Sequence, residues 1–184
     1  MKNSLFFTLV ILTGLSLAAA EPQKPNVIVI MADDLGYGDL SCYGTESFET
    51  PYIDQLATEG VRFTSGYCSA STCTPTRWSF LTGTYAFREK NTGIAAPSSP
   101  LRVNHEITCI GDMFKTAGYS TAIIGKWHLG LGGEDGPDWN GELKPGPLEI
   151  GFDTCFLLPT TNDRVPQVYA VSYTHLTLPT SPKG

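Results

Sequence analysis

The stretch from Thr108 to His128 reads TCIGDMFKTAGYSTAIIGKWH, in which a helix pattern is followed directly by a strand pattern. In its first part, apolar residues recur at helical spacing between Thr108, a capping residue, and Gly118, a residue that commonly ends helices. The second part, residues 121–124, is an apolar run typical of a strand that is buried on both faces. The stretch therefore predicts one helix followed by one strand of an α/β fold.

The same alternation of helices and strands extends toward the N-terminus. Residues 26–31 (NVIVIM) form a second apolar run of the buried-strand type. Helices are expected over residues 51–59 and 74–81, each with a proline in its first turn, and a short strand is expected over residues 61–63. Strands that alternate with helices favour the α/β class, with a mostly parallel sheet flanked by helices.

Polar side chains directly follow two of the predicted strands. Asp33 and Asp34 come after the first apolar run, and Lys126 and His128 come after the later one. Because ligands of parallel sheets bind outside the carboxyl ends of the strands, both pairs are expected at the same edge. Adjacent acids at a strand end are more often a solvated turn, but carboxylate oxygens also suit Ca²⁺ or Mg²⁺.

Residues 71–77 read STCTPTR and place Cys73 at a predicted helix start, with Pro75 and Arg77 close behind it. A helix N-terminus favours negative charge and offers free N–H groups, and the guanidinium of Arg77 adds a fixed cation. The segment therefore predicts a reactive side chain beside an anion site. Two alternatives are a structural cysteine, buried or in a disulfide with Cys68, and a plain thiolate nucleophile. No nearby histidine forms an obvious Cys–His pair.

Two segments resemble the signatures of the sulfatase family. Residues 71–83 match the first signature at every defined position, with the Cys-x-Pro-x-Arg core intact, and residues 118–128 resemble the second throughout. The resemblance implies an alkaline phosphatase-like α/β fold and a sulfuric ester hydrolase. It also implies that a maturation enzyme oxidises Cys73 to formylglycine. One hydroxyl of the hydrated aldehyde would attack sulfur, and the second would expel sulfate by re-forming the aldehyde.

The resemblance also implies roles for individual residues. Lys126 would contact the sulfate and the formylglycine, and His128 would hydrogen-bond the latter, beside the fixed cation of Arg77. The run from Asp33 to Asp39 looks like the family's N-terminal metal motif, in which Asp33, Asp34 and the modified Cys73 bind Ca²⁺ or Mg²⁺. Thr161 matches a position at which family members often carry a hydroxyl group close to the sulfate.

Residues 1–20 have the pattern of a secretory signal peptide, with cleavage expected after Ala20. Without this segment 11 Lys and Arg remain against 18 Asp and Glu, so the net charge moves from -6 to -7. An acidic chain without a basic stripe argues against nucleic acid as a partner. We expect an exported protein, periplasmic or secreted, without a membrane segment after cleavage. Its five cysteines leave at least one thiol unpaired.

By the same resemblance, residues 21–170 are the N-terminal part of a sulfatase catalytic domain. We therefore expect a fold that is incomplete at its C-terminus and a chain that is inactive on its own. Residues 171–184 resemble a translated sequencing adapter, and the alternative is a genuine polar tail. The expected substrate is a sulfated small molecule or carbohydrate. Two rival functions stay open: a phosphonate monoester or phosphodiester hydrolase with the same nucleophile motif, and a catalytically silent, truncated secreted protein.

Overall fold

The computed structural model describes residues 23–177, which divide into one unit that ends at Gly36 and a second that begins at Tyr37. In the first unit, residues 23–36 form neither helix nor strand, and Ile28 and Ile30 are more than 80% exposed. The prediction of a buried strand over residues 26–31 is therefore wrong for this structure. An apolar run becomes a strand only when neighbouring strands satisfy its backbone groups. The predicted signal peptide lies outside the described residues.

The second unit opens with two short 3-10 helices, η1 (Tyr37–Asp39) and η2 (Ser41–Tyr43), and with helix α1 (Pro51–Glu59), which confirms the predicted helix over 51–59. Hydrogen bonds tie η2 to α1, because the carboxylate of Asp54 accepts from the Ser41 hydroxyl and from the Cys42 N–H. These bonds hold the pKa of Asp54 below its usual value, with the Ser41 bond as the largest cause. Residues 61–63 do not form the predicted strand, and their apolar side chains are exposed.

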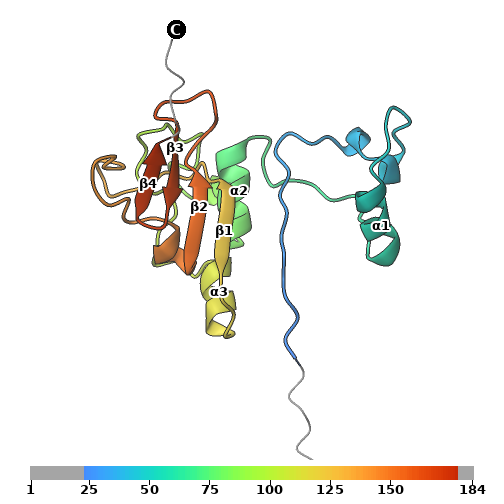
Figure 1. The fold of residues 1–184 in the computed structure, drawn as a ribbon, viewed down its shortest axis with the longest axis horizontal. Coiled ribbons are helices and arrows are strands. Elements are labelled where there is room, and N and C mark those ends of the chain that lie inside the picture. Colours follow the sequence, from blue (N-terminus) through green and yellow to red (C-terminus); the bar gives the residue numbers. More distant parts are fainter. Residues whose placement is uncertain (1–22, 178–184) are drawn as a thin grey trace, which may run out of the picture. The chain divides into compact units, whose positions relative to one another are not determined.

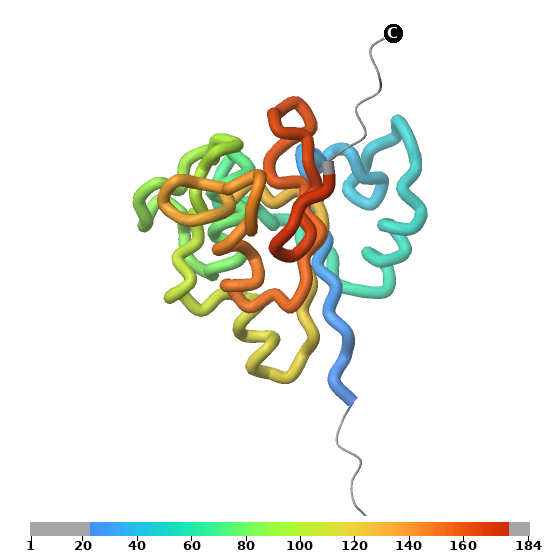
Figure 2. The backbone as a smooth tube through the Cα atoms, turned by 60° about the vertical axis from the view of Figure 1, so that its left-hand side comes forward, coloured from blue at the N-terminus to red at the C-terminus, as the bar shows by residue number. Residues whose placement is uncertain are grey.

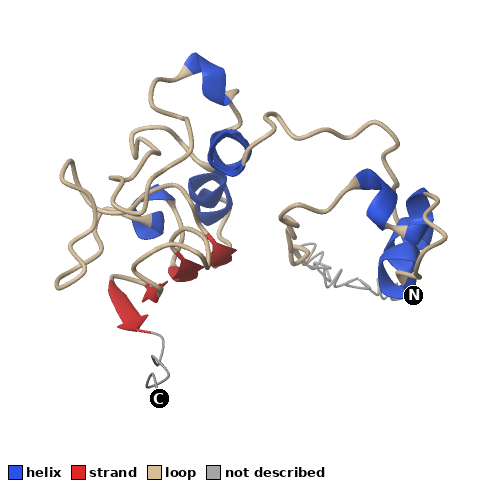
Figure 3. Cartoon of the chain, turned by 90° about the horizontal axis from the view of Figure 1, so that it is seen from above, coloured by secondary structure: helices blue, strands red, loops and turns tan. Residues whose placement is uncertain are grey.

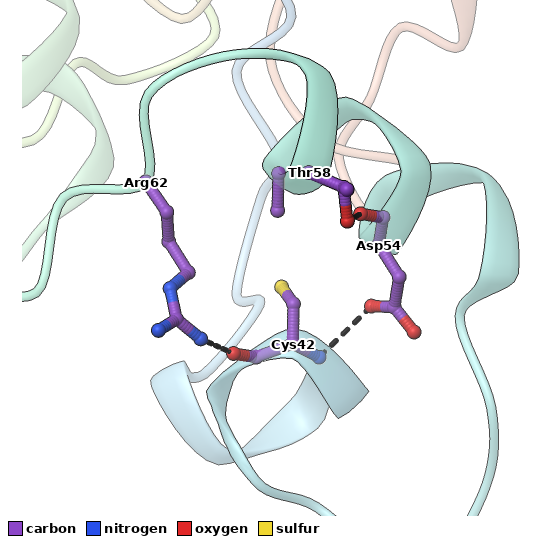
Figure 4. Close-up of a pocket in the computed structure, with 5 residues that line it drawn as sticks. Cys42, Asp54, Thr58 and Arg62 are labelled. Atoms are coloured by element: carbon purple, nitrogen blue, oxygen red, sulfur yellow. Dashed lines mark hydrogen bonds between the residues drawn. The ribbon is translucent and has the colours of Figure 1, made fainter.

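A hollow of about 420 Å³ lies between η2 and α1. Figure 4 shows the main chain of Cys42 between Asp54 and Arg62, which hydrogen-bond to its N–H and carbonyl oxygen respectively. Ala57 and Thr58 line the rest of the wall. Since the polar groups at the rim bond to one another, the hollow follows from the way α1 packs on η2.

Helices α2 (Cys73–Thr82) and α3 (Ile110–Thr116) confirm the two remaining helix predictions. The cap of α3 is Cys109 rather than Thr108, because the Asp112 carboxylate accepts a hydrogen bond from the Cys109 N–H. Gly83 ends α2 in the left-handed conformation that glycine adopts without strain. A further 3-10 helix, η3 (Ala86–Arg88), follows α2.

The sheet contains four described strands: β1 (Ala122–Lys126), β2 (Thr154–Leu158), β3 (Val168–Val171) and β4 (Thr174–Thr177), in that spatial order. A 3-10 helix, η4 (Pro147–Ile150), precedes β2. Only the β1–β2 pair is parallel, and β3 joins both of its neighbours antiparallel. The prediction of a mostly parallel sheet is therefore wrong for these strands, although β1 confirms the predicted strand (Figure 1).

A tight connection explains the antiparallel part of this sheet. Two residues separate β3 from β4, and a connection this short joins only antiparallel strands. The predicted strands that would have extended the parallel part, 26–31 and 61–63, form no strand. β4 falls within the segment 171–184, for which an adapter origin stays a prediction.

One face of the sheet carries the core. Cys155, Leu157, Val168 and Ala170 are buried, whereas Ile124 on β1 is 77% exposed. Figure 3 shows the helices next to the sheet on one side of the strands. The largest buried side chains of this core are Trp78, Trp127, Leu129, Leu143, Ile150 and Leu157.

Two loops lie side by side on this core, at the end of the sheet where β1 stops. Hydrogen bonds join the segment 99–102 to the segment 129–132, and Figure 2 shows the two segments, green and orange, next to each other. Gly130 has a φ of +72° and lies against the Pro100 carbonyl, so a side chain has no room there. The loops thereby fix the path of the chain just after β1. No helix within residues 23–177 is both long enough and apolar enough to cross a membrane.

Candidate active site

Cys73 and His128 contact each other in the structure. Cys73 is the first residue of α2 and is half-buried, and its Sγ lies 3.1 Å from Nδ1 of His128, just after β1. The two residues are 55 positions apart in the sequence. The interpretation that no nearby histidine pairs with Cys73 is therefore wrong, because the fold brings a distant histidine to it.

The His128 ring has a defined orientation. Its Nε2 lies 3.1 Å from the carbonyl oxygen of Ala95, which can only accept a hydrogen bond. Nε2 therefore carries the proton of the neutral ring, and the lone pair of Nδ1 faces residue 73. His128 itself has a φ of +57° and is 3% exposed, so its backbone adopts a conformation that few residues other than glycine take.

The surroundings of His128 favour its neutral form. Burial is the largest cause that lowers its pKa below the ordinary value of 6.5, and the positive charges of Lys126, Arg77 and Arg164 lower it further. The hydrogen bond with Ala95 acts in the opposite direction but does not outweigh them. At neutral pH the ring is therefore unprotonated at Nδ1 and able to accept a proton from a group at position 73.

Arg77 joins the start of α2 to the end of β1. Its Nη1 donates a hydrogen bond of 2.6 Å to the carbonyl oxygen of Lys126, and both residues are half-buried. This bond holds one guanidinium beside the last residue of the strand, one turn along the helix from Cys73. The structure thus brings Cys73, Arg77, Lys126 and His128 together where α2 begins and β1 ends, and the expectation that Asp33 and Asp34 lie at the same edge stays a prediction.

Sequence reasoning missed Arg164, a further cation whose charge acts on His128 and which is ion-paired with Asp163 at 3.8 Å. It lies after β2 and, like Lys126 and Arg77, is close enough for its charge to lower the pKa of His128. Neighbouring Asp163 has a lowered pKa, caused first by the Thr161 hydroxyl and also by the charges of Arg164 and Lys126. Thr161, the position matched by resemblance, therefore lies in the same loop as this cation. No strand over residues 154–158 is predicted from the sequence, which therefore contains no signal for a cation just beyond that strand.

Asp33 and Asp34 belong to the first unit, where both are exposed and Asp34 has a φ of +61°. Within residues 23–177, no group of three or more His, Cys, Asp and Glu side chains is arranged to hold a metal ion. The donor set itself fits a hard cation, because carboxylate oxygens are the ligands that Ca²⁺ and Mg²⁺ prefer. The metal site with Asp33, Asp34 and Cys73 therefore stays a prediction.

All five cysteines are free thiols, which excludes the alternative of a Cys68–Cys73 disulfide in this structure. Cys109 and Cys155 are buried, and burial raises the pKa of both thiols, to about 11 for Cys109. Such thiols are poor nucleophiles because the thiolate is the reactive form. Of the cysteines, Cys73 is the one with a histidine contact.

Comparison with known proteins identifies the family of this chain. Residues 25–177 match the protein-family model described as Sulfatase. N-acetylgalactosamine-6-O-sulfatase of Bacteroides thetaiotaomicron is 52% identical over 147 residues, which cover 80% of this chain and 29% of that protein. Human arylsulfatase A is 44% identical over 157 residues, which cover 85% of this chain and 29% of that protein.

Solved structures show the same relationship. A structure reported with glycosaminoglycan metabolism by Bacteroides thetaiotaomicron has a TM-score of 0.82 and 50% identity, covering 84% of this chain and 32% of that one. A structure in complex with its substrate D-glucosamine-2-N,6-O-disulfate has a TM-score of 0.63 and 28% identity, covering 85% and 28%. The chain spans less than a third of the length of these relatives. The two signatures, the match over 25–177 and the identity to several sulfatases together establish that the chain belongs to the sulfatase family.

Proposed function

We propose that this chain carries the nucleophile-bearing part of an exported sulfuric ester hydrolase that acts through a formylglycine made from Cys73. The observation that carries the proposal is the contact between Cys73 Sγ and His128 Nδ1 at the start of α2, beside the cations at the end of β1. Sulfatase family membership supports the reaction class, since the family hydrolyses sulfate esters.

The residues of the chain supply three functions for this reaction. The N-terminus of α2 and the cations of Arg77 and Lys126 favour an anion, so they would bind the sulfate group and stabilise the charge that develops on it. The neutral His128 ring would accept a proton at Nδ1 from the residue at position 73. Formylglycine, when present, would supply a hydrated aldehyde with two hydroxyl groups, which are needed for attack on sulfur and for release of sulfate.

A divalent cation fits the proposal through Asp33 and Asp34. These two carboxylates would hold Ca²⁺ or Mg²⁺ together with the modified residue 73, and the cation would neutralise charge on the sulfate. A formylglycine-generating enzyme would be an obligatory partner, because the gene encodes cysteine at this position. Export through a signal peptide at residues 1–20 would place the protein in the periplasm or outside the cell.

A sulfated carbohydrate is the substrate class that we propose. The relative with 52% identity is an N-acetylgalactosamine-6-O-sulfatase, whereas human arylsulfatase A and human steryl-sulfatase are 44% and 41% identical. Since substrate loops vary within a fold, the difference in identity supports the carbohydrate class without naming one sugar. Phosphonate monoesters and phosphodiesters are the rival substrates.

A comparison of substrates tests the proposal. The complete protein that contains this chain would be produced with a formylglycine-generating enzyme and assayed on 6-O-sulfated amino sugars, an aryl sulfate and a phosphodiester. We expect release of sulfate from the sugars to exceed release from the aryl ester, with little turnover of the phosphodiester. Faster phosphodiester hydrolysis would favour the rival, and no turnover by fully modified protein would favour the catalytically silent alternative.

A further inference from the structure

Thr74 occupies an unusual place beside the candidate active site. It directly follows Cys73 in the first turn of α2, and its side chain is completely buried. Its hydroxyl donates a hydrogen bond of 2.8 Å to the carbonyl oxygen of His128 and accepts one of 3.0 Å from the N–H of Ala95. One side chain therefore satisfies two main-chain groups from two separate loops.

The same two residues, Ala95 and His128, meet a second time. The carbonyl oxygen of Ala95 accepts the hydrogen bond from Nε2 of the His128 ring. Ala95 is 1% exposed and His128 is 3% exposed, so water does not reach these groups. The result is a closed circuit of three hydrogen bonds, which runs from the Thr74 hydroxyl through the main chain and ring of His128 to Ala95 and back.

This circuit determines where the imidazole points. The orientation of the ring depends on the position of the Ala95 carbonyl, to which Nε2 is hydrogen-bonded. The main-chain conformation of His128, with its φ of +57°, depends on the hydrogen bond from the Thr74 hydroxyl. A backbone conformation of this kind persists only when its surroundings hold it. Without the hydroxyl, a buried N–H at Ala95 and a buried carbonyl at His128 would lose their partner, and both loops would rearrange to regain one.

We propose that Thr74 is a positioning residue of this site, whose hydroxyl holds Ala95 and His128 so that the ring presents Nδ1 to residue 73. The catalytic meaning of this role rests on the proposed function, whereas the geometry does not. The circuit predicts that serine can replace Thr74 and that valine, which has the same shape but no hydroxyl, cannot.

The test observes the His128 ring directly. The 184-residue chain would be labelled with ¹⁵N-histidine, and the ring nitrogen shifts at neutral pH report which nitrogen carries the proton. In the wild type and in Thr74→Ser, we expect the Nε2-protonated form and a slowly exchanging Ala95 amide. In Thr74→Val, we expect a mixture of both tautomers and exchange of the Ala95 amide that is at least tenfold faster.

A matched control comes from the same helix. Thr82 donates its hydroxyl to the Trp78 carbonyl in the last turn of α2, so Thr82→Val makes the same change away from the circuit. We expect the His128 ring nitrogen shifts of Thr82→Val to equal those of the wild type. If Thr74→Val shows the same shifts and the same exchange as Thr82→Val, the proposal is overturned.

A wild-type measurement decides the matter if Thr74→Val does not fold. The Nδ1-protonated form in the wild type, or a freely exchanging Ala95 amide, overturns the proposal, and so does failure of Thr74→Ser to reproduce the wild-type signals. The opposite results support it. Since no readout depends on turnover, absence of sulfate release from the complete protein would count against the proposed function and leave the role of Thr74 standing.

Discussion

Replacing Arg77 by methionine tests how the start of α2 is joined to the end of β1. The change keeps an unbranched apolar stem but removes the guanidinium and with it the 2.6 Å hydrogen bond to the Lys126 carbonyl. A hydrogen bond from a charged donor contributes about 1.5–3 kcal/mol, so we expect the free energy of unfolding to fall by that amount. Urea unfolding of the 184-residue chain measures the loss. Arg88→Met is the control, because Arg88 is exposed on η3 and its loss is expected to cost less than about 0.5 kcal/mol.

The same pair of variants tests the anion site. A ligand that binds the folded chain stabilises it, by about 2.7 kcal/mol at 100 times its Kd. Sulfate also stabilises proteins in general, and Arg88→Met shares that part. We therefore expect a smaller gain from sulfate in Arg77→Met than in Arg88→Met. Equal gains in the two variants, or equal stabilities without sulfate, would refute the assignment of Arg77 to the anion site or to the helix–strand contact.

Three further predictions concern the core and the histidine. Leu157 on β2 is fully buried, so Leu157→Ala should lower the free energy of unfolding by about 2–5 kcal/mol. Phe156→Ala, on the opposite and more exposed face of the sheet, should lower it clearly less. Equal losses in the two variants would contradict a core on one face only. Gly130→Ala should destabilise the chain by more than about 1 kcal/mol, because its Cβ would meet the Pro100 carbonyl and the φ of residue 130 is positive. Urea unfolding measures this loss. An unchanged unfolding midpoint would argue against the loop geometry. Because burial lowers the pKa of His128 in the folded chain, the unfolded chain binds the proton first, and the free energy of unfolding should fall as the pH drops through about 6.5. His128→Gln should flatten that part of the pH profile of stability. A profile identical to that of the wild type would contradict this prediction.

Elements with local signals could be predicted from the sequence. Caps, prolines and helical spacing located α1, α2 and α3, and the apolar run before Lys126 located β1. The run at 26–31 has an equally strong pattern but forms no strand in the structure, because pairing depends on neighbouring strands and not on the run itself. The antiparallel β3–β4 pair depends on a two-residue turn that was not recognised.

Some residues of the candidate site could likewise be predicted from the sequence, and others could not. Cys73, Arg77, Lys126 and His128 were found because they lie in two signature segments, each readable in isolation. The Cys73–His128 contact joins these segments across the fold, so no spacing rule could reveal it. Ala95 acts through main-chain atoms, which give no signal in a sequence.

The hypothesis that residues 171–184 derive from an adapter has its own check. Resequencing of the native gene across the codons for residues 165–184 should show coding sequence that departs from the sequence of this chain near residue 170 and contains no adapter. A native stop codon directly after Gly184 would contradict the hypothesis and make β4 part of the natural protein.

The chemical identity of residue 73 in active protein is the most direct test of the proposed mechanism. The complete protein would be isolated from cells that contain a formylglycine-generating enzyme, and the tryptic peptide from Phe63 to Arg77 would be analysed by mass spectrometry alongside sulfate release. We predict that sulfate release rises in proportion to the fraction of peptide that carries the aldehyde or its hydrate, and that Cys73→Ala abolishes it. Full activity in protein whose Cys73 remains an unmodified thiol would contradict the mechanism.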